Sequence, residues 1–289
     1  MLKSLYRCFL IIKRCFAESG KLAKWLLHFL LYYKKIKSIE NGGKKVIVVG
    51  NGPSVSDFDF FMFSRLGYEF LCVNYFALDE RFFKIRPKFY CIVDPAVYKK
   101  CQDVNDKANE LFHILENVDW EMTLVCTAYQ RPVINNKLIR VDKINNHVYN
   151  GTIKWLQKSV YNKNIGTFGY QNVICAALYY LLSSNVLEIG LIGVENDWHR
   201  ELYVDENNDV IREYRHFYGT QRINITLDEQ IQRGELYKYF YWYYITLYQY
   251  SIAASYAKMK SILVYNYCKY SYIDVFDKKQ LVRNNDVDS

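Results

Sequence analysis

A glycine-rich turn in the first quarter of the chain has the residue types that hold phosphate groups. Gly50-Asn51-Gly52-Pro53-Ser54 directly follows Val46–Val49, a run of four β-branched residues. Such a run is typical of a short strand buried on both faces, and glycines let the next turn approach a ligand closely. Pro53 suits the first position of a helix, whose amides attract anions. The turn matches neither the dinucleotide fingerprint nor the P-loop, so an ordinary strand-to-helix connection is the alternative.

Polar residues also follow other apolar runs where strands are expected to end. Asn74 follows 70–73, Asp94 follows 89–93, and Glu195 comes just after 186–192. The carboxyl ends of parallel strands meet at one edge of a sheet, where sheets of this kind bind ligands. We therefore expect these three side chains to lie near Asn51.

The segment 196–226 is polar, aromatic and long for a simple connection. A connection of about 30 residues in a compact domain is often functional, and we expect a lid over the site. Arg212 and Arg215 could bind an anionic substrate there, although both also suit a solvated surface.

Two histidines of this segment, His216 and His199, are the candidate general bases, because imidazole titrates near neutral pH. Asp197 or Glu195 could accept a proton in their place. The remaining histidines have no partners at a spacing that suggests a site, and no group of His and Cys residues has the spacing of a zinc ligand set.

Strand-like and helical segments alternate after residue 44. This order predicts an α/β domain over 44–277 with a doubly wound, mostly parallel, Rossmann-like sheet. The expected strands are 46–49, 70–73, 89–93, 122–126, 138–141, 186–192 and 261–266, and the expected helices 96–117, 170–182 and 227–260. The aromatic residues over 237–250 recur at helical spacing and favour a core position over an acceptor platform. Residues 278–289 form a polar tail.

Residues 1–43 form a basic leader. Residues 1–45 hold eleven Lys and Arg but two acids, whereas the remainder holds 27 basic and 28 acidic residues. Apolar residues recur over 1–37 at helical spacing, as one or two helices around Gly20, and basic residues interrupt each run before it could span a bilayer. We expect this segment to lie on an anionic membrane surface, with packing on the body or a partner as the alternative.

The neutral body argues against nucleic-acid binding, which requires basic folded faces. The eight cysteines contain no C-x-x-C pair, and several lie in apolar runs. Reduced thiols in a cytoplasmic protein are therefore expected.

The turn at 50–54, Asn74, Gly193-Val194-Glu195 and the later His216-Phe217-Tyr218-Gly219 together resemble two related groups. One is the bacterial sialyltransferases of lipooligosaccharide synthesis. The other is the wider MptE-like domain group, which includes flagellin-glycosylation accessory factors and hydroxymethylpterin diphosphokinases. The resemblance covers roughly 44–275. The residue four positions after His216, where the sialyltransferases have their catalytic histidine, is Thr220 here, and Asp94 replaces an asparagine.

The resemblance implies an inverting glycosyltransferase that moves an acidic sugar from a CMP-activated donor to a lipopolysaccharide or capsule acceptor. It requires no cofactor, and Mg²⁺ would not be essential. The resemblance also implies a role for each group of residues. Gly50, Asn51, Gly52 and Ser54 would hold the nucleotide phosphate, and Asn74 and Asp94 would face the nucleotide or the donor sugar. Thr167 and Gly169 would lie near the cytidine, and Tyr203 would donate to the leaving phosphate.

Two other functions fit the same residues. A pterin diphosphokinase would use the turn for ATP and the pair Asp94 and Glu195 for Mg²⁺. A non-catalytic, nucleotide-sugar-binding accessory protein of a glycan assembly complex would need no base. In each glycan-related case we expect a peripheral protein at the inner face of the cytoplasmic membrane.

Overall fold

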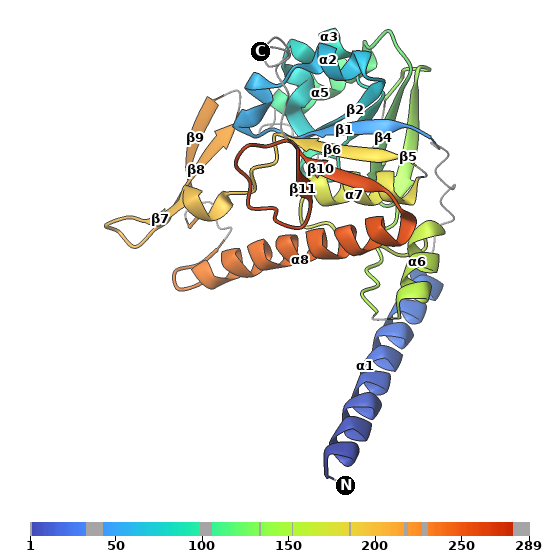
Figure 1. The fold of residues 1–289 in the computed structure, drawn as a ribbon. Coiled ribbons are helices and arrows are strands. Elements are labelled where there is room, and N and C mark those ends of the chain that lie inside the picture. Colours follow the sequence, from blue (N-terminus) through green and yellow to red (C-terminus); the bar gives the residue numbers. More distant parts are fainter. Residues whose placement is uncertain are drawn as a thin grey trace, which may run out of the picture.

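The computed structural model describes residues 2–32, 43–98, 106–132, 134–151, 153–184, 186–216, 219–226 and 231–279. Within these residues, eight strands form one sheet in the order β11-β10-β6-β1-β2-β3-β4-β5 (Figure 1). Their bounds are β1 Lys45–Val49, β2 Tyr68–Val73, β3 Phe89–Cys91, β4 Met122–Thr127, β5 Ile139–Ile144, β6 Glu188–Ile192, β10 Leu263–Asn266 and β11 Asp277–Lys278. The pairings between them are parallel. The predicted α/β fold with a mostly parallel, Rossmann-like sheet is confirmed.

Helices cover both faces of this sheet. Figure 1 shows α2 (Phe60–Arg65), α3 (Arg81–Ile85) and α5 (Asp106–Glu116) above it, and α7 (Val173–Ser183) and α8 (Leu236–Lys260) below it. Residues Ile174–Leu182 of α7 are all buried, because α7 packs between the sheet and α8. The shorter helical segments are η1 Pro53–Asp57, η2 Asn74–Leu78, α4 Pro95–Tyr98 and α6 Lys154–Asn162.

The chain changes direction within the sheet beside β1. Strands β2 to β5 follow β1 on one side, whereas β6 and then β10 lie on its other side. The loops that leave β1 and β6 therefore meet at the carboxyl edge, with Val49 paired to Ile192 at the end of the register. This switch point is where open α/β sheets bind ligands.

The segment expected as an irregular lid is a second, antiparallel sheet. The 3₁₀ segment η3 (Trp198–Glu201) leads into β7 (Leu202–Val204), β8 (Val210–His216) and β9 (Gly219–Asn224). The buried residues Val210, Ile225, Ile231 and Tyr239 form a small core beneath it. The strands carry many polar residues, so the sequence interpretation did not identify them as strands.

The leader is one helix, α1 (Leu2–Tyr32), and Gly20 does not interrupt it. The indole Nε1 of Trp25 donates to the carbonyl oxygen of Ile165 at 3.2 Å, and its ring packs on Tyr149. These contacts fix the second half of α1 on the body. No described helix, α1 included, is long and apolar enough to cross a membrane. The linker before Gly43 and the tail after 279 lie outside the described residues.

The aromatic residues of α8 lie on two faces, which corrects the expectation that this run is core. Tyr239 and Tyr250 are buried, as expected. A second set is exposed to solvent, comprising Tyr237, Phe240, Tyr241, Tyr244 and Tyr248.

Candidate functional site

A cavity of about 1110 Å³ lies at the carboxyl edge of the parallel sheet. The loops that follow β1, β2, β3, β4 and β6 line it, together with η3 and β8 of the second sheet. Many of the residues singled out in the sequence line it, namely Gly50, Asn51, Gly52, Pro53, Asn74, Asp94, Gly193, Val194, Glu195, Asp197 and Arg212. Ser54, Thr167, Gly169, His199 and Tyr203 are not among its lining residues.

Five buried polar atoms that line this cavity have no hydrogen-bond partner within the described part of the chain. They are Asn51 Oδ1, Asn74 Oδ1, Asn146 Oδ1, Glu195 Oε2 and Asn196 Nδ2. Buried polar atoms are nearly always paired, because an unpaired one costs about 1–3 kcal/mol. Unpaired polar atoms on residues that line a cavity mark it as the candidate site for a polar ligand.

Two of these asparagines share an uncommon backbone conformation. Asn74 and Asn196 have φ of 50° and 54°, in the left-handed region that asparagine adopts more readily than most residues. A tyrosine hydroxyl holds each one: Tyr90 Oη donates to the carbonyl oxygen of Asn74 at 2.6 Å, and Tyr243 Oη to that of Asn196 at 2.9 Å. The fold thus fixes both turns at the places where Asn74 and Asn196 line the cavity.

The sequence interpretation missed Asn146 and Asn196. Asn146 comes two residues after the end of β5, and Asn196 directly follows Glu195. Both therefore follow strands, and the signal that identified Asn74 and Asp94 could have found them.

The glycine-rich turn is packed against the turn after β6. Gly50 N donates to Ile192 O at 2.8 Å, and Gly52 N donates to Gly193 O at 2.9 Å. A Cβ on Gly50 would overlap the carbonyl group of Gly193, so glycine is required for this close approach. The expectation that the amides of Gly50 and Gly52 hold a phosphate is corrected, because both already donate to β6 and its turn.

Ser54 also faces the protein rather than the cavity. Its amide donates to Glu195 Oε1 at 2.9 Å, and its hydroxyl accepts from Gly193 N at 3.0 Å and contacts Cys268 Sγ at 3.4 Å. The expected phosphate contact of Ser54 is therefore corrected to a structural one, which ties the turn to the carboxylate of Glu195.

The carboxylate of Glu195 lies over Gly52, where a Cβ would overlap its Oε2. Burial raises the pKa of Glu195 above its ordinary value, although the hydrogen bonds from Ser54 oppose the shift. A carboxylate with a raised pKa and one unpaired oxygen at a cavity has the properties of a general base.

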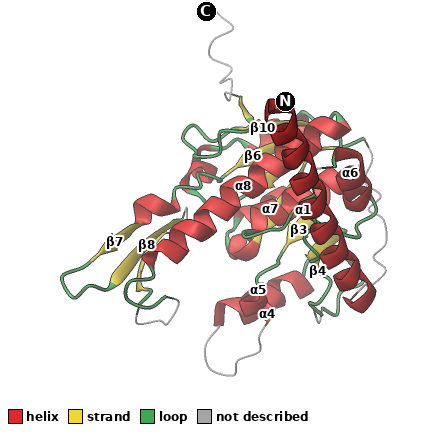
Figure 2. Ribbon diagram, turned by 90° about the horizontal axis from the view of Figure 1, so that it is seen from below, coloured by secondary structure: helices red, strands yellow, loops and turns green. Residues whose placement is uncertain are grey.

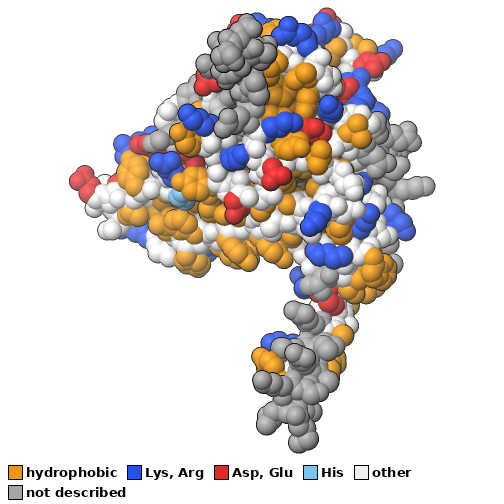
Figure 3. Space-filling model, in the orientation of Figure 1, with side chains coloured by type: hydrophobic (Ala, Val, Ile, Leu, Met, Phe, Trp, Pro, Cys, Tyr) orange, Lys and Arg blue, Asp and Glu red, His pale blue; other side chains and the backbone are white. Residues whose placement is uncertain are grey.

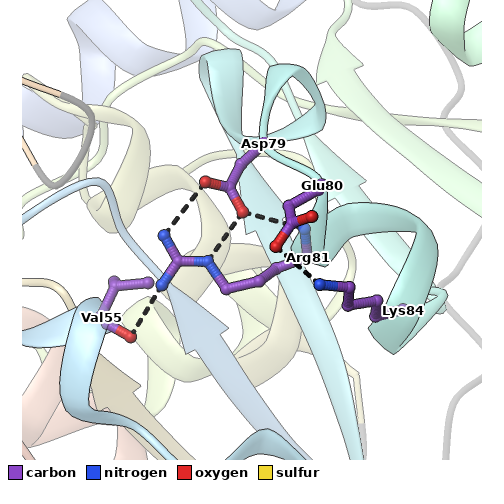
Figure 4. Close-up of polar contacts among 5 residues, drawn as sticks. All are labelled: Val55, Asp79, Glu80, Arg81 and Lys84. Carbon is purple, nitrogen blue, oxygen red and sulfur yellow. Dashed lines mark hydrogen bonds and ion pairs between the residues drawn. The ribbon is translucent and has the colours of Figure 1, made fainter.

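Arg81 holds the glycine-rich turn from outside (Figure 4). Its guanidinium donates to the carbonyl oxygen of Val55 at 3.2 Å and forms an ion pair with Asp79 at 2.7 Å. Burial raises the pKa of Asp79, but the hydrogen bonds and charge of Arg81 outweigh burial and the net shift is downward. The hydrogen bond to Val55 links the segment after β2 to η1, and the ion pair with Asp79 holds the guanidinium in place for it.

Thr167 and Gly169 lie behind the cavity wall. Thr167 is fully buried and its amide donates to His147 O at 2.7 Å, whereas its Oγ1 accepts from Gly169 N at 3.2 Å. Side chains cannot occupy the space at Gly169, because Gln249 Nε2 would lie 2.6 Å from a Cβ there. Thr167 and Gly169 do not line the cavity themselves, whereas the next residues in the chain, Tyr170 to Ile174, do.

The three candidates for catalysis in the second sheet lie in different surroundings. The His199 ring packs edge-on against Tyr272, with centroids 4.3 Å apart, and also against Tyr243. Tyr203 is 39% exposed on β7, with the Arg222 guanidinium over its ring. The backbone of His216 ends β8, paired with Gly219, but its side chain lies outside the described part of the structure, as does that of Arg215.

Charged and aromatic groups form the rest of the wall. Arg212 lines the cavity, but its guanidinium already contacts other residues of the protein. Its Nε donates to Glu201 at 2.9 Å, and the guanidinium lies over the rings of Trp198 and Tyr239. Arg131 and Tyr129 line the opposite wall and are exposed.

Asp94 lines the cavity but also caps α4, since its Oδ1 accepts from Ala96 N at 2.8 Å. Asp94 and Glu195 are the two carboxylates that a diphosphokinase would use for Mg²⁺. Across the described residues, no group of three or more His, Cys, Asp or Glu side chains could hold a metal ion.

Comparison with known proteins gives one structural neighbour to report. No protein-family model matches the chain, and no curated protein matches it. In three dimensions the chain is similar to the MAf glycosyltransferase of Magnetospirillum magneticum AMB-1, at 14% sequence identity and a TM-score of 0.40. The similarity covers 88% of this chain and 34% of that protein, so the chain spans about a third of its length.

Proposed function

We propose that this protein is an inverting glycosyltransferase that uses a nucleotide-activated sugar bound in the cavity at the carboxyl edge of the sheet. The observation that carries the proposal is the convergence there of Asn51, Asn74, Asn146, Glu195 and Asn196, each with an unpaired buried polar atom. Sugars and ribose present many hydroxyl groups, which pair well with amide and carboxylate side chains. Sites for small molecules occupy about 300–1,000 Å³, so this cavity has room for a nucleotide and its sugar.

The donor we propose is a CMP-activated acidic sugar, as in the sialyltransferases that the turn and strand-end residues resemble. The exposed ring of Tyr129 offers a stacking surface for the base. The guanidinium of Arg131 suits a phosphate or a sugar carboxylate, both of which bind arginine through two hydrogen bonds.

Transfer requires a base for the acceptor hydroxyl. The acceptor oxygen would form a bond to the anomeric carbon from the face opposite the phosphate, and the bond from that carbon to the phosphate oxygen would break and release CMP. The proton of the acceptor hydroxyl would pass to Glu195 Oε2. Asp197, which also lines the cavity, is the alternative base. Neither step requires a metal, since side-chain donors can stabilise the departing phosphate.

The acceptor we propose is a surface glycan, lipopolysaccharide or capsule, assembled at the inner face of the cytoplasmic membrane. The basic helix α1 supports this location, because lipid-linked acceptors are held at an anionic surface. The second sheet remains our candidate for a lid, because η3 and β8 supply one wall of the cavity.

A non-catalytic accessory role is the second candidate. It is favoured by the turn after β1, whose Gly50, Gly52 and Ser54 amides are all paired within the protein. A nucleotide-sugar-binding protein would still use the asparagines. The diphosphokinase alternative depends on a metal at Asp94 and Glu195.

Thermal-shift and calorimetric titration with CMP, UDP, GDP and ATP, each with and without Mg²⁺, tests these functions together. A glycosyltransferase of the proposed kind binds CMP without metal and hydrolyses a CMP-sugar slowly in the absence of acceptor. Binding of CMP without any hydrolysis or transfer would favour the accessory role. Binding of ATP alone, and only with Mg²⁺, would overturn the proposal in favour of the diphosphokinase.

A further inference from the structure

One face of α8 presents a row of aromatic side chains to solvent. Its members are each between 43% and 65% exposed and are Tyr237, Phe240, Tyr241, Tyr244 and Tyr248. Steps of three and four residues place them on the same side of the helix, opposite the side that packs on α7. Figure 3 shows hydrophobic side chains along the lower edge of the body, where Figure 1 draws α8. We call these five residues the aromatic stripe.

Three rings of the aromatic stripe form a continuous row. The rings of Tyr244 and Tyr248 stack with centroids 6.1 Å apart, and those of Tyr241 and Tyr244 are 6.4 Å apart. Single exposed aromatic residues are common on proteins, but contiguous exposed apolar patches mark surfaces that bind a partner or a membrane. The stripe therefore has the character of a docking surface.

The charge of this surface limits what can dock on it. Helix α8 contains no Asp or Glu, whereas it contains Lys238, Lys258 and Lys260. Two lysines of α6 extend across to it: Lys154 Nζ donates to Ser255 Oγ at 3.1 Å, and Lys158 Nζ donates to Met259 O at 2.7 Å. At the start of α8, Lys238 forms an ion pair with Glu235 at 2.5 Å. The basic groups therefore gather at the C-terminal end of the helix, and a partner that extends over this end should be anionic.

Further residues extend the surface beyond α8. Trp155, which follows Lys154 on α6, is 73% exposed. The basic helix α1 lies on the same side of the molecule, as the view from below shows (Figure 2), and Lys21 Nζ donates to Asn150 O at 3.4 Å near the start of α6. Helices α1, α6 and α8 therefore share one aromatic and basic side.

We propose that the aromatic stripe docks this protein on an anionic lipid bilayer, with Trp155 and the neighbouring lysines. Tyrosine and tryptophan concentrate at membrane interfaces, where the ring meets the acyl boundary and the polar end stays among the headgroups. Lysines beside such a surface bind anionic headgroups. The lysines at the C-terminal end of α8 favour this occupant over a second copy of the chain, because a second copy would bring the same positive charge to that end.

Co-sedimentation of the full chain with vesicles tests the proposal, using phosphatidylcholine alone and phosphatidylcholine mixed with phosphatidylglycerol. The test variant replaces Tyr241, Tyr244 and Tyr248 by serine. The matched control replaces Phe61, Leu66 and Phe83 by serine, which are equally exposed but lie on or beside α2 and α3, across the sheet from α8. Both variants are checked for folding by circular dichroism and thermal melting. A single Tyr244→Glu variant provides a second test if the triple variant does not fold.

We expect binding to the anionic vesicles, a loss of roughly tenfold or more in the stripe variant and in Tyr244→Glu, and no loss in the control. Equal binding by the wild type and the stripe variant would overturn the proposal and leave α1 as the sole contact. Equal binding to neutral and anionic vesicles would also overturn it. Light scattering gives a further decisive outcome: a wild-type dimer that the stripe variant converts to a monomer would assign the stripe to contact between copies. None of these outcomes depends on the proposed transfer reaction.

Discussion

The hydroxyl of Tyr90 donates to the carbonyl oxygen of Asn74 at 2.6 Å and accepts from the amide of Ala77 at 2.8 Å. One side chain of β3 therefore holds the turn that ends β2, where Asn74 lines the cavity. The structure of the site consequently depends on buried tyrosine hydroxyls as well as on the residues that line it.

Tyr90→Phe should lower the free energy of unfolding by about 1–3 kcal/mol, because the Ala77 amide and the Asn74 carbonyl lose a buried partner. Urea denaturation measures this loss. The control is Tyr241→Phe, where the ring is exposed and a change within about 0.5 kcal/mol is expected. Equal stability of both variants would show that the Tyr90 hydroxyl does not hold the turn.

Two substitutions of Asn74 separate its backbone from its side chain. Asn74→Gly keeps the left-handed conformation and removes the amide, so we expect near-native stability and about tenfold weaker nucleotide binding. Asn74→Ala should lose the same affinity and also about 1–2 kcal/mol of stability, because alanine adopts a φ of 50° less readily than asparagine does. Calorimetric titration and denaturation check the two effects. Unchanged nucleotide affinity in both variants would remove Asn74 from the proposed site.

Glu195→Gln should reduce the rate of sugar transfer by about 10²–10⁴-fold while leaving donor affinity near that of the wild type, because the amide retains an oxygen for Ser54 but cannot accept the proton. Product formation at saturating donor and acceptor measures the rate. A variant that loses donor affinity in proportion to rate would identify Glu195 as a binding residue instead.

The difference in stability between the wild type and Glu195→Gln should depend on pH. The folded-state pKa of Glu195 is raised, so the stability that this carboxyl contributes is fully present below the unfolded pKa of about 4.3 and is lost as pH rises through the folded pKa. Glutamine carries no charge, so Glu195→Gln should gain stability relative to the wild type as pH rises from about 4 to neutral. Denaturation curves across this range give the difference. A difference that is constant with pH would contradict the upward shift.

Gly52→Ala should destabilise the protein by about 1–3 kcal/mol, because the added Cβ would overlap Glu195 Oε2 and lie 2.8 Å from Gly193 O. The control is Gly20→Ala, where no atom lies within 4 Å of the added Cβ and the helix should gain stability. Thermal melting of the two variants distinguishes a packed turn from a mobile one, since a mobile turn would tolerate both changes alike.

His199→Phe should leave sugar transfer unchanged, because the His199 ring packs on Tyr272 and Tyr243 and its Nδ1 has no partner in the described structure. His199→Ala should lose stability of about 1 kcal/mol through the missing ring contacts. A strong loss of transfer in His199→Phe would return His199 to the role of general base.

The strands could be predicted because their residue types are dictated by burial on both faces, as in Val46–Val49. The residues at the strand ends could also be predicted, because a parallel sheet brings Asn51, Asn74, Asp94 and Glu195 to one edge. What the sequence could not indicate was how the amides of Gly50 and Gly52 pair. Their partners come from the turn after β6, more than 130 residues away along the chain.

The second sheet escaped prediction for a related reason. Its strands carry Arg, Glu and Tyr with few apolar residues, and its small core depends on Tyr239 of α8 and on Ile231. The sequence likewise could not predict that one side of α8 is exposed. Aromatic residues lie on both sides of this helix, so the sequence pattern does not distinguish a buried side from an exposed one.

The backbone contact between Gly50 and Gly193 has a consequence for selectivity. The backbones at the ends of β1 and β6 are in direct contact, so neither can move without the other. The base of the cavity is therefore preorganised, and a bound molecule need not order it. Under the proposed function, discrimination among nucleotides would then depend on exposed side chains that line the cavity, such as Tyr129 and Arg131. A change of donor in the course of evolution would leave both glycines in place and alter those two side chains.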